Sequence, residues 1–229
     1  MISYNTIQKS LSYFYQYFIR SQDRKIYGHI AKSAEISAPL FVSNPQNLFI
    51  DEFSRLQRNA KIINSKEEKI IIKKYVEIAY GLTIITGNHT PTVGIPQFLL
   101  GPTHINDKHT DIIIEDDVWI GANVTLLAGA HIGRGCIVGA CSIVNKNIPP
   151  YAVVAGTPAH IIASKFSIEG IIRHEKSIYS EEERLSRAYL EDLFSRYFTE
   201  KKAIGIECSL NDKQTKILEQ TKEKYKFYT

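Results

Sequence analysis

The sequence predicts a mainly β protein, a parallel β-helix solenoid with a protruding loop and with helices at both ends. Three observations support this fold class. Aliphatic residues return every six positions through the middle of the chain. A long interruption separates the upstream and downstream repeats, between residues 90 and 111. Apolar stripes with helical spacing lie on both sides of the repeat.

The six-residue repeat is most regular between residues 114 and 149. The first positions are Ile114, Ile120, Leu126, Ile132, Val138 and Val144, and the fifth positions are Val118, Val124, Ala130, Cys136, Ser142 and Ile148. A period of six fits neither a helix nor an alternating strand. It fits short strands that turn a corner every six residues, so that three hexapeptides make one triangular coil. We expect the first positions to fill the interior and the fifth positions to pack near the corners.

The repeat continues upstream less regularly, which extends the predicted solenoid to residues 30–163. The upstream aliphatic positions are Ile30 and Ile36, then Ile50, Leu56 and Ile62, then Ile72, Ile78 and Ile84. Residues 90–111 interrupt it with prolines and glycines, which are typical of a loop. A loop this long is usually functional or disordered, and the apolar segment at residues 98–100 favours a loop that packs against something. We predict that it forms a wall of the active site.

The segments outside the repeat are predicted to be helical. Residues 1–29 carry an apolar stripe of Leu11, Phe14, Tyr15, Phe18 and Ile19. We expect this helix to cap the open end of the solenoid, because an uncovered coil exposes strand edges. Residues 164–229 form a C-terminal extension with a helix from Ser180 to Phe198. A capping box of Ser180 and Glu183 and an i, i+4 pair of Glu183 with Arg187 support that helix. The tail after residue 201 is expected to be helical only near its end.

Composition and charge exclude several classes of protein. Lys and Arg number 28 against 24 Asp and Glu, a net charge of +4 that is spread along the chain and does not indicate nucleic-acid binding. No apolar run reaches the roughly 20 residues of a membrane span. The first residues do not read as a signal peptide. Three cysteines, an odd number, argue against a disulfide framework. These features predict a cytoplasmic protein.

The segment VWIGANVTLLAGAHIGRGCIVGACSIVNKNIPPYAVVAGTPAHII, residues 118–162, allows a family resemblance. It resembles the hexapeptide-repeat acyltransferases of the left-handed parallel β-helix class, and is most similar to the xenobiotic, maltose and capsular-glycan O-acetyltransferases. The resemblance implies an acetyl-CoA-dependent O-acetyltransferase that acts on a saccharide hydroxyl, such as a capsule or surface-glycan precursor. It also implies a homotrimer in which coenzyme A lies between adjacent subunits.

His89 is the candidate general base. The segment ITGNHT resembles the place where this family keeps its catalytic histidine, followed by a long loop. His89 falls at the sixth, outward position of its hexapeptide, where the repeat gives way to the loop. An imidazole can take the proton that an acceptor hydroxyl loses during attack on the thioester. No carboxylate close to His89 in sequence is an obvious partner, so a backbone carbonyl is the alternative that would orient the ring.

The resemblance also implies a set of coenzyme A contacts. They are Trp119, Ala122, Ala140, Asn145, Lys146 and His160. Ala122 and Ala140 are 18 residues apart and should stack on the same face, where small side chains let the pantetheine arm approach the backbone. Trp119 faces outward as a wall of the pantetheine site, as an interface residue, or as both. His160 stands where the family usually has Arg or Lys, which weakens the case for a phosphate contact.

His104 and His109 raise the question of a metal. Their H-x4-H spacing is similar to that of zinc-binding carbonic anhydrases built on the same helix. Those enzymes use three histidines held on regular coils, whereas this pair lies in the loop, so we predict no metal. Two further readings stay open. One is N-acetylation of an amino sugar or acetylation of an antibiotic, and the other is a β-helix binding scaffold without catalysis.

Overall fold

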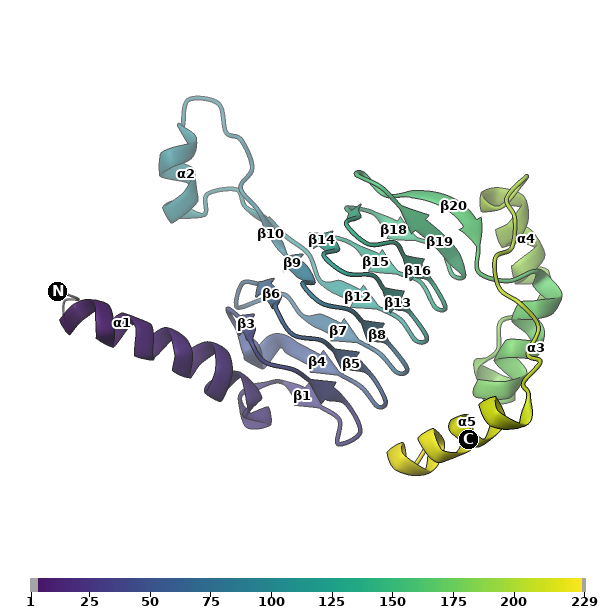
Figure 1. Cartoon of the computed structure of the whole chain (residues 1–229). Coiled ribbons are helices and arrows are strands. Elements are labelled where there is room, and N and C mark those ends of the chain that lie inside the picture. Colours follow the sequence, from purple (N-terminus) through teal and green to yellow (C-terminus); the bar gives the residue numbers. More distant parts are fainter. Residues whose placement is uncertain (1–3, 228–229) are drawn as a thin grey trace.

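The structure is a computed structural model that describes residues 4–227, and it forms a tapering stack of β coils with three walls (Figure 1). Wall A contains β1 (His29–Ile30), β4 (Leu48–Ile50), β7 (Ile70–Ile72), β12 (Ile112–Ile114), β15 (His131–Ile132) and β18 (Asn147–Ile148). Wall B contains β2 (Glu35–Ile36), β5 (Arg55–Leu56), β8 (Glu77–Ile78), β13 (Trp119–Ile120), β16 (Ile137–Val138), β19 (Ala152–Ala155) and β20 (His160–Ser164). Wall C contains β3 (Leu40–Val42), β6 (Ala60–Ile63), β9 (Thr83–Ile85), β14 (Thr125–Leu127) and β17 (Ile143–Val144).

These walls confirm the predicted β-solenoid. Strands one coil apart pair in parallel, as Ile114 does with Ile72 below it and Ile132 above it. Within the three walls as the structure describes them, only the last pair, β19 with β20, is antiparallel. Every first and fifth position of the regular repeat is at most 3% exposed. The interior is therefore a set of stacked aliphatic rows, whose removal from water stabilises the coils.

The expected loop is an arm that leaves the corner between walls C and A. Its stem is an antiparallel pair of β10 (Gly87–Asn88) and β11 (Lys108–His109), and it carries the short helix α2 (Gln97–Thr103). Figure 1 shows the arm standing away from the coils. Leu100 is fully buried, but its neighbours Phe98 and Leu99 are exposed. Of the three apolar residues that were expected to pack, only Leu100 is therefore buried.

The N-terminal helix forms, but its apolar stripe does not cover the end of the solenoid. Helix α1 (Tyr4–Phe14) continues through short turns, η1 (Tyr15–Ile19), η2 (Arg20–Gln22) and η3 (Arg24–Ile26). Its apolar residues Leu11 and Phe14 are exposed, and it projects away from the first coil (Figure 1). The turns that follow α1 contact the first coil: the Tyr17 and Phe41 rings stack with centroids 5.3 Å apart, and Arg24 donates to the carbonyl of Ala31 at 2.9 Å. Another short turn, η4 (Pro45–Asn47), lies within the first coils.

The C-terminal extension contains three helices and differs from the prediction. They are α3 (Ile168–Ile178), α4 (Arg187–Tyr197) and α5 (Asp212–Tyr225), with a 3-10 turn η5 (Glu181–Glu183) between the first two. The capping box of Ser180 and Glu183 is present, but it opens only that turn. The backbone N–H of Leu185 donates to the Glu175 carboxylate, which removes it from a continuous helical ladder. A new helix then starts at the Ser186 cap, and Arg187 pairs with Glu169.

Two general properties of the chain can be read from this fold. Within residues 4–227, no helix has both the length and the apolar character that crossing a bilayer requires. The three cysteines are free: Cys136 is buried, and Cys141 and Cys208 are exposed.

Candidate active site

The base of the arm brings a histidine and a carboxylate together. In the arm stem, Gly87 pairs with His109 and Asn88 with Lys108. His89 and Asp107 are the next rung of this hairpin, so the antiparallel register places them opposite each other. Nδ1 of His89 lies 3.0 Å from Oδ2 and 3.2 Å from Oδ1 of Asp107. The Asp107 side chain is only 3% exposed, whereas the His89 side chain is 50% exposed and open to a reactant.

The electrostatics of this pair determine which ring nitrogen of His89 is free. Hydrogen bonds from His104 and then from His89 lower the pKa of Asp107 below its usual value, against the effect of burial. Asp107 is therefore a carboxylate near neutral pH, and a carboxylate only accepts hydrogen bonds. The Nδ1 of His89 must carry the proton in this contact, which leaves a lone pair on Nε2 of the neutral ring.

Asp107 corrects one expectation from the sequence. A carboxylate, not a backbone carbonyl, orients His89. The two residues are 18 positions apart, so proximity along the chain gave no signal. The signal that could have found Asp107 is the register of the hairpin, because pairing Gly87 with His109 places His89 opposite Asp107. The sequence alone does not show that the loop begins as an antiparallel pair of strands, so this register could not be predicted.

The other two histidines of the loop do not form a pair with each other. His104 ends α2 with a left-handed backbone and its Nδ1 lies 2.8 Å from Oδ2 of Asp107. Its ring centroid is 5.6 Å from that of His89. His109 instead points its Nδ1 toward Glu68, 3.7 Å from Oε2, and this buried atom has no hydrogen-bond partner among the described residues. The H-x4-H spacing therefore does not correspond to a shared site.

The two alanines of the predicted donor site stack as expected. Ala122 and Ala140 lie on successive coils at the corner between walls B and C, and the N–H of Cys141 donates to the carbonyl of Ala122 at 2.9 Å. A Cβ at Gly121 would lie 2.6 Å from the backbone nitrogen of Ala140, so the corner admits no larger side chain there. Trp119 stands half exposed on the outer face of wall B, paired in the sheet with Glu77 and Ile137. Ala122 is partly exposed and Ala140 is exposed, so solvent reaches this corner of the coils.

The remaining residues predicted to contact coenzyme A lie elsewhere. Asn145 and Lys146 are exposed between β17 and β18, at the corner between walls C and A from which the arm also leaves. His160 is exposed at the start of β20. One chain therefore holds His89 and the two alanines at different corners of the triangle.

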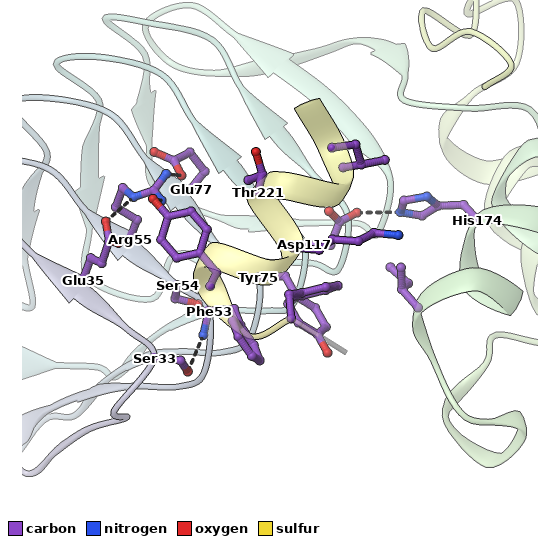
Figure 2. Close-up of a pocket in the computed structure, with 15 residues that line it drawn as sticks. Ser33, Glu35, Phe53, Ser54, Arg55, Tyr75, Glu77, Asp117, His174 and Thr221 are labelled. Atoms are coloured by element: carbon purple, nitrogen blue, oxygen red, sulfur yellow. Dashed lines mark hydrogen bonds and ion pairs between the residues drawn. The ribbon is translucent and has the colours of Figure 1, made fainter. Parts of the chain in front are cut away.

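A cavity of about 370 Å³ lies on another side of the molecule, between the first coils and helices α3 and α5 (Figure 2). Aromatic side chains line it, together with Arg55, which lies 2.7 Å from both Glu35 and Glu77. Within the described part of the chain, His89 and the donor residues are not among its lining residues. Two further acid–base groups of its lining, Asp117 and His174, pair with each other, so every carboxylate of the cavity already has a cationic or imidazole partner.

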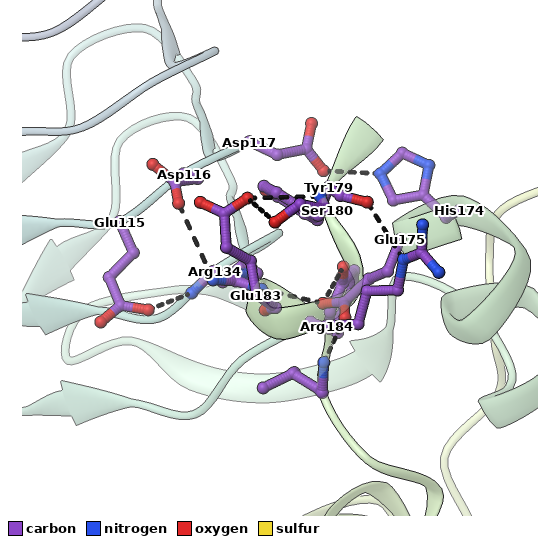
Figure 3. A network of polar contacts seen from close by, with 12 residues as sticks. Glu115, Asp116, Asp117, Arg134, His174, Glu175, Tyr179, Ser180, Glu183 and Arg184 are labelled. Atoms are coloured by element: carbon purple, nitrogen blue, oxygen red, sulfur yellow. Dashed lines mark hydrogen bonds and ion pairs between the residues drawn. The ribbon is translucent and has the colours of Figure 1, made fainter. Parts of the chain in front are cut away.

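A polar network attaches the C-terminal extension to the coil corner (Figure 3). Oδ2 of Asp117 lies 2.6 Å from Nζ of Lys165 and 2.9 Å from Nε2 of His174. Burial raises the pKa of Asp117, but His174 and Lys165 together lower it more, and the net shift is downward. The buried Glu175 accepts from the Tyr151 hydroxyl at 3.0 Å and from Arg134 at 3.4 Å. These groups satisfy one another, which is the pattern of a structural network.

Comparisons with known proteins agree with the β-solenoid fold. Residues 111–146 match the family described as bacterial transferase hexapeptide (six repeats). A probable macrolide acetyltransferase from Lysinibacillus sphaericus is 40% identical over 155 residues, which cover 57% of this chain and 84% of that protein.

Two solved structures share the fold. A hexapeptide-repeat-containing acetyltransferase from Vibrio cholerae O1 biovar eltor, complexed with acetyl coenzyme A, superposes with a TM-score of 0.57 at 24% identity, covering 71% of this chain and 90% of that one. A maltose O-acetyltransferase from Clostridium difficile 630 superposes with a TM-score of 0.56 at 24% identity, covering 68% of this chain and 83% of that one.

Proposed function

The chain belongs to the hexapeptide-repeat acyltransferases, and from this premise we propose that it transfers the acetyl group of acetyl-CoA to a hydroxyl, with His89 as the general base. The observation that carries the proposal is the contact between Nδ1 of His89 and the buried carboxylate of Asp107. It holds the ring in one orientation and leaves Nε2 accessible with a lone pair. A histidine that served only packing would need neither feature.

The proposed reaction is a direct attack. Nε2 of His89 takes the proton of the acceptor hydroxyl while its oxygen attacks the thioester carbonyl carbon. The carbon–sulfur bond breaks, and the thiol leaves with the proton that the imidazole had taken. An acyl-enzyme is not part of this mechanism. Burial raises the pKa of Cys136 to about 12, which makes it a poor nucleophile, and Cys141 lies at the corner of the two alanines, away from His89.

The donor is proposed to lie along the residues that the sequence singled out. They are Trp119, Ala122, Ala140, Asn145, Lys146 and His160. Since His89 and the alanines stand at different corners of one chain, a site that contains both needs two copies. A homotrimer with three shared sites meets this requirement. We place the reaction in the cytoplasm, with which three free cysteines are consistent.

Two classes of hydroxyl acceptor follow from different observations. The resemblance of the repeat segment favours a saccharide, such as a capsule or surface-glycan precursor. The 40% identical relative favours a macrolide as the second candidate. Transfer to the amine of an amino sugar is a weaker alternative, because the arm offers the single carboxylate of Asp107 and His89 and His104 both bind it. A binding scaffold without catalysis would have no use for an oriented His89.

The experiment measures the thiol released from acetyl-CoA by the full-length protein, with a panel of sugars, oligosaccharides, amino sugars and macrolides. We expect release with one hydroxyl class only. His89→Ala should lower the rate by about 10²–10⁴-fold. His29→Ala, at an exposed histidine of the first coil, is the matched control and should keep the wild-type rate. An undiminished rate in His89→Ala would refute the base, and thiol release with amines alone would refute the O-acetyltransferase.

A further inference from the structure

Three side chains at the base of the arm bring together atoms that could bind a metal ion, a property that the proposed acetyl transfer does not require. We call His89, His104 and Asp107 the arm cluster. One ligand atom from each residue, two imidazole nitrogens and one carboxylate oxygen, lies within 4.8 Å of the other two. Two imidazoles and one carboxylate form a donor set that suits Zn²⁺ and the neighbouring divalent transition metals.

The distances in the cluster are close to those of a coordinated ion. Nδ1 of His104 and Nδ1 of His89 lie 2.8 and 3.0 Å from the same oxygen of Asp107. Ligands of a tetrahedral Zn²⁺ lie about 2.0–2.1 Å from the metal, and therefore about 3.3 Å from one another. An ion that replaces the two Nδ1 protons needs each of these two nitrogen–oxygen distances to lengthen by only a few tenths of an ångström, and the ligand atoms of the two rings lie within 4.8 Å of each other. Three protein ligands also leave one position open for water.

The cluster is accessible and held by the arm itself. The side chains of His89 and His104 are 50% and 64% exposed, so an ion can reach them from solvent, while Asp107 below them is buried. His104 adopts a left-handed backbone at the end of α2, and Asn106 donates from its side chain to Thr92 on the other side of the arm at 3.2 Å. These contacts fix the turn that carries two of the ligands, so little order has to be created on binding.

We infer that the arm cluster binds Zn²⁺ or a similar divalent transition metal, and that the bound ion blocks acetyl transfer; the second part rests on the proposed role of His89. In the metal-free ring the proton sits on Nδ1 and the lone pair on Nε2. A metal on Nδ1 displaces that proton, and the neutral ring then carries it on Nε2. No proton is gained or lost overall, but the lone pair that would accept the hydroxyl proton is gone.

The test uses full-length protein freed of metal with a chelator. Binding is followed by calorimetry with Zn²⁺ and by the visible absorption of four-coordinate Co²⁺, neither of which depends on activity. We expect one ion per chain. His104→Gln should weaken binding by at least about tenfold, and Asp107→Asn should also weaken it. His29→Gln should bind as the wild type does. In the wild type, thiol release should fall as the site fills, and in His104→Gln it should fall only at correspondingly higher Zn²⁺.

Each outcome decides a part of the inference. If the wild type binds no ion, or if His104→Gln binds as tightly as the wild type, the arm cluster is not the site, and the role of His89 as base is untouched. If the ion binds and the rate rises, the block is wrong and the ion assists the reaction. If the ion binds, the rate is unaffected and His89→Ala is also unaffected, the proposed base has failed while the metal site stands.

Discussion

Asp107 is the residue on which the chemistry of the arm depends. It is the buried member of a group whose other two side chains face solvent, and it accepts hydrogen bonds from both of them. Its low pKa keeps it charged near neutral pH, so it can fix the tautomer of His89 without taking the proton itself. A positioning residue of this kind acts through the base and does not touch the acceptor.

Replacing Asp107 by Asn should lower kcat by roughly one to three orders of magnitude, because an amide can stabilise the wrong tautomer of His89. The KM for acetyl-CoA should stay unchanged, since Asp107 lies outside the proposed donor contacts. Steady-state kinetics with thiol detection measure both quantities. Asp192→Asn, at an exposed ion pair with Arg196, is the control. A loss that appears in KM instead of kcat would contradict the positioning role.

The six-residue coil is the unit that stabilises the solenoid. Along β14, Leu126 points inward and is fully buried, and its neighbour Leu127 points outward and is partly exposed. The two leucines have the same side chain and lie on the same strand, and they differ only in the face of the sheet to which they point. We therefore expect truncation of the side chain to destabilise the protein at Leu126 and to be tolerated at Leu127.

Leu126→Ala should lower the free energy of unfolding by about 2–5 kcal/mol, because it leaves a cavity in the stacked aliphatic row. Leu127→Ala should cost less than about 1 kcal/mol. Urea unfolding at a fixed protein concentration measures both, since oligomerisation makes stability depend on concentration. Equal losses at the two positions would mean that the inward row does not carry the stability of the coil.

Charged contacts join the C-terminal helices to the coils, beside apolar residues such as Ile171 and Leu190 that belong to the core. Asp117 bonds Lys165 at the end of wall B and His174 on α3, and so links a coil corner to the extension. Its φ of 57° is the left-handed region, which Asn tolerates well. Asp117→Asn therefore removes the charge without adding backbone strain.

This variant should lose about 2 kcal/mol at pH 7, a value between those of exposed and buried ion pairs. The pKa of Asp117 is lowered on folding, so its stabilising effect is complete above its unfolded value near 4 and is lost as the pH falls through the folded value. The melting temperatures of the wild type and of Asp117→Asn should consequently converge below about pH 4. A difference that persists unchanged at low pH would contradict the charge explanation.

The whole molecule presents apolar surface in places where a single chain offers nothing to cover it. Leu11 and Phe14 on α1 and Phe98 on the arm are all exposed, and α1 and the arm both stand away from the coils (Figure 1). His89 and the alanines of the donor surface also lie at different corners. Both facts favour an assembly in which the arm of one copy meets the wall of the next.

Co-expression of two inactive variants tests this arrangement. His89→Ala lacks the base and Ala140→Arg fills the donor surface, so each should be inactive alone. In mixed trimers, a site with an intact base from one copy and an intact donor surface from the next should form in about one quarter of cases. Thiol release should therefore recover to about that fraction of the wild-type rate. No recovery, with trimers confirmed by light scattering, would place both functions within one chain.

The repeat could be predicted from the sequence because the six-residue spacing of the aliphatic residues is enough to show which positions are buried. The same holds for the arm, which appears as a break in the period, and for His89 as a candidate, through the resemblance of ITGNHT. Tertiary structure decided the rest. The partner of His89, the proximity of His104 and the split of the C-terminal helix at Leu185 all depend on contacts between residues that lie 10 to 18 positions apart in the chain. Such contacts follow from the register of the hairpin and from the position of a buried carboxylate, and neither of these produces a regular spacing of residue types in the sequence.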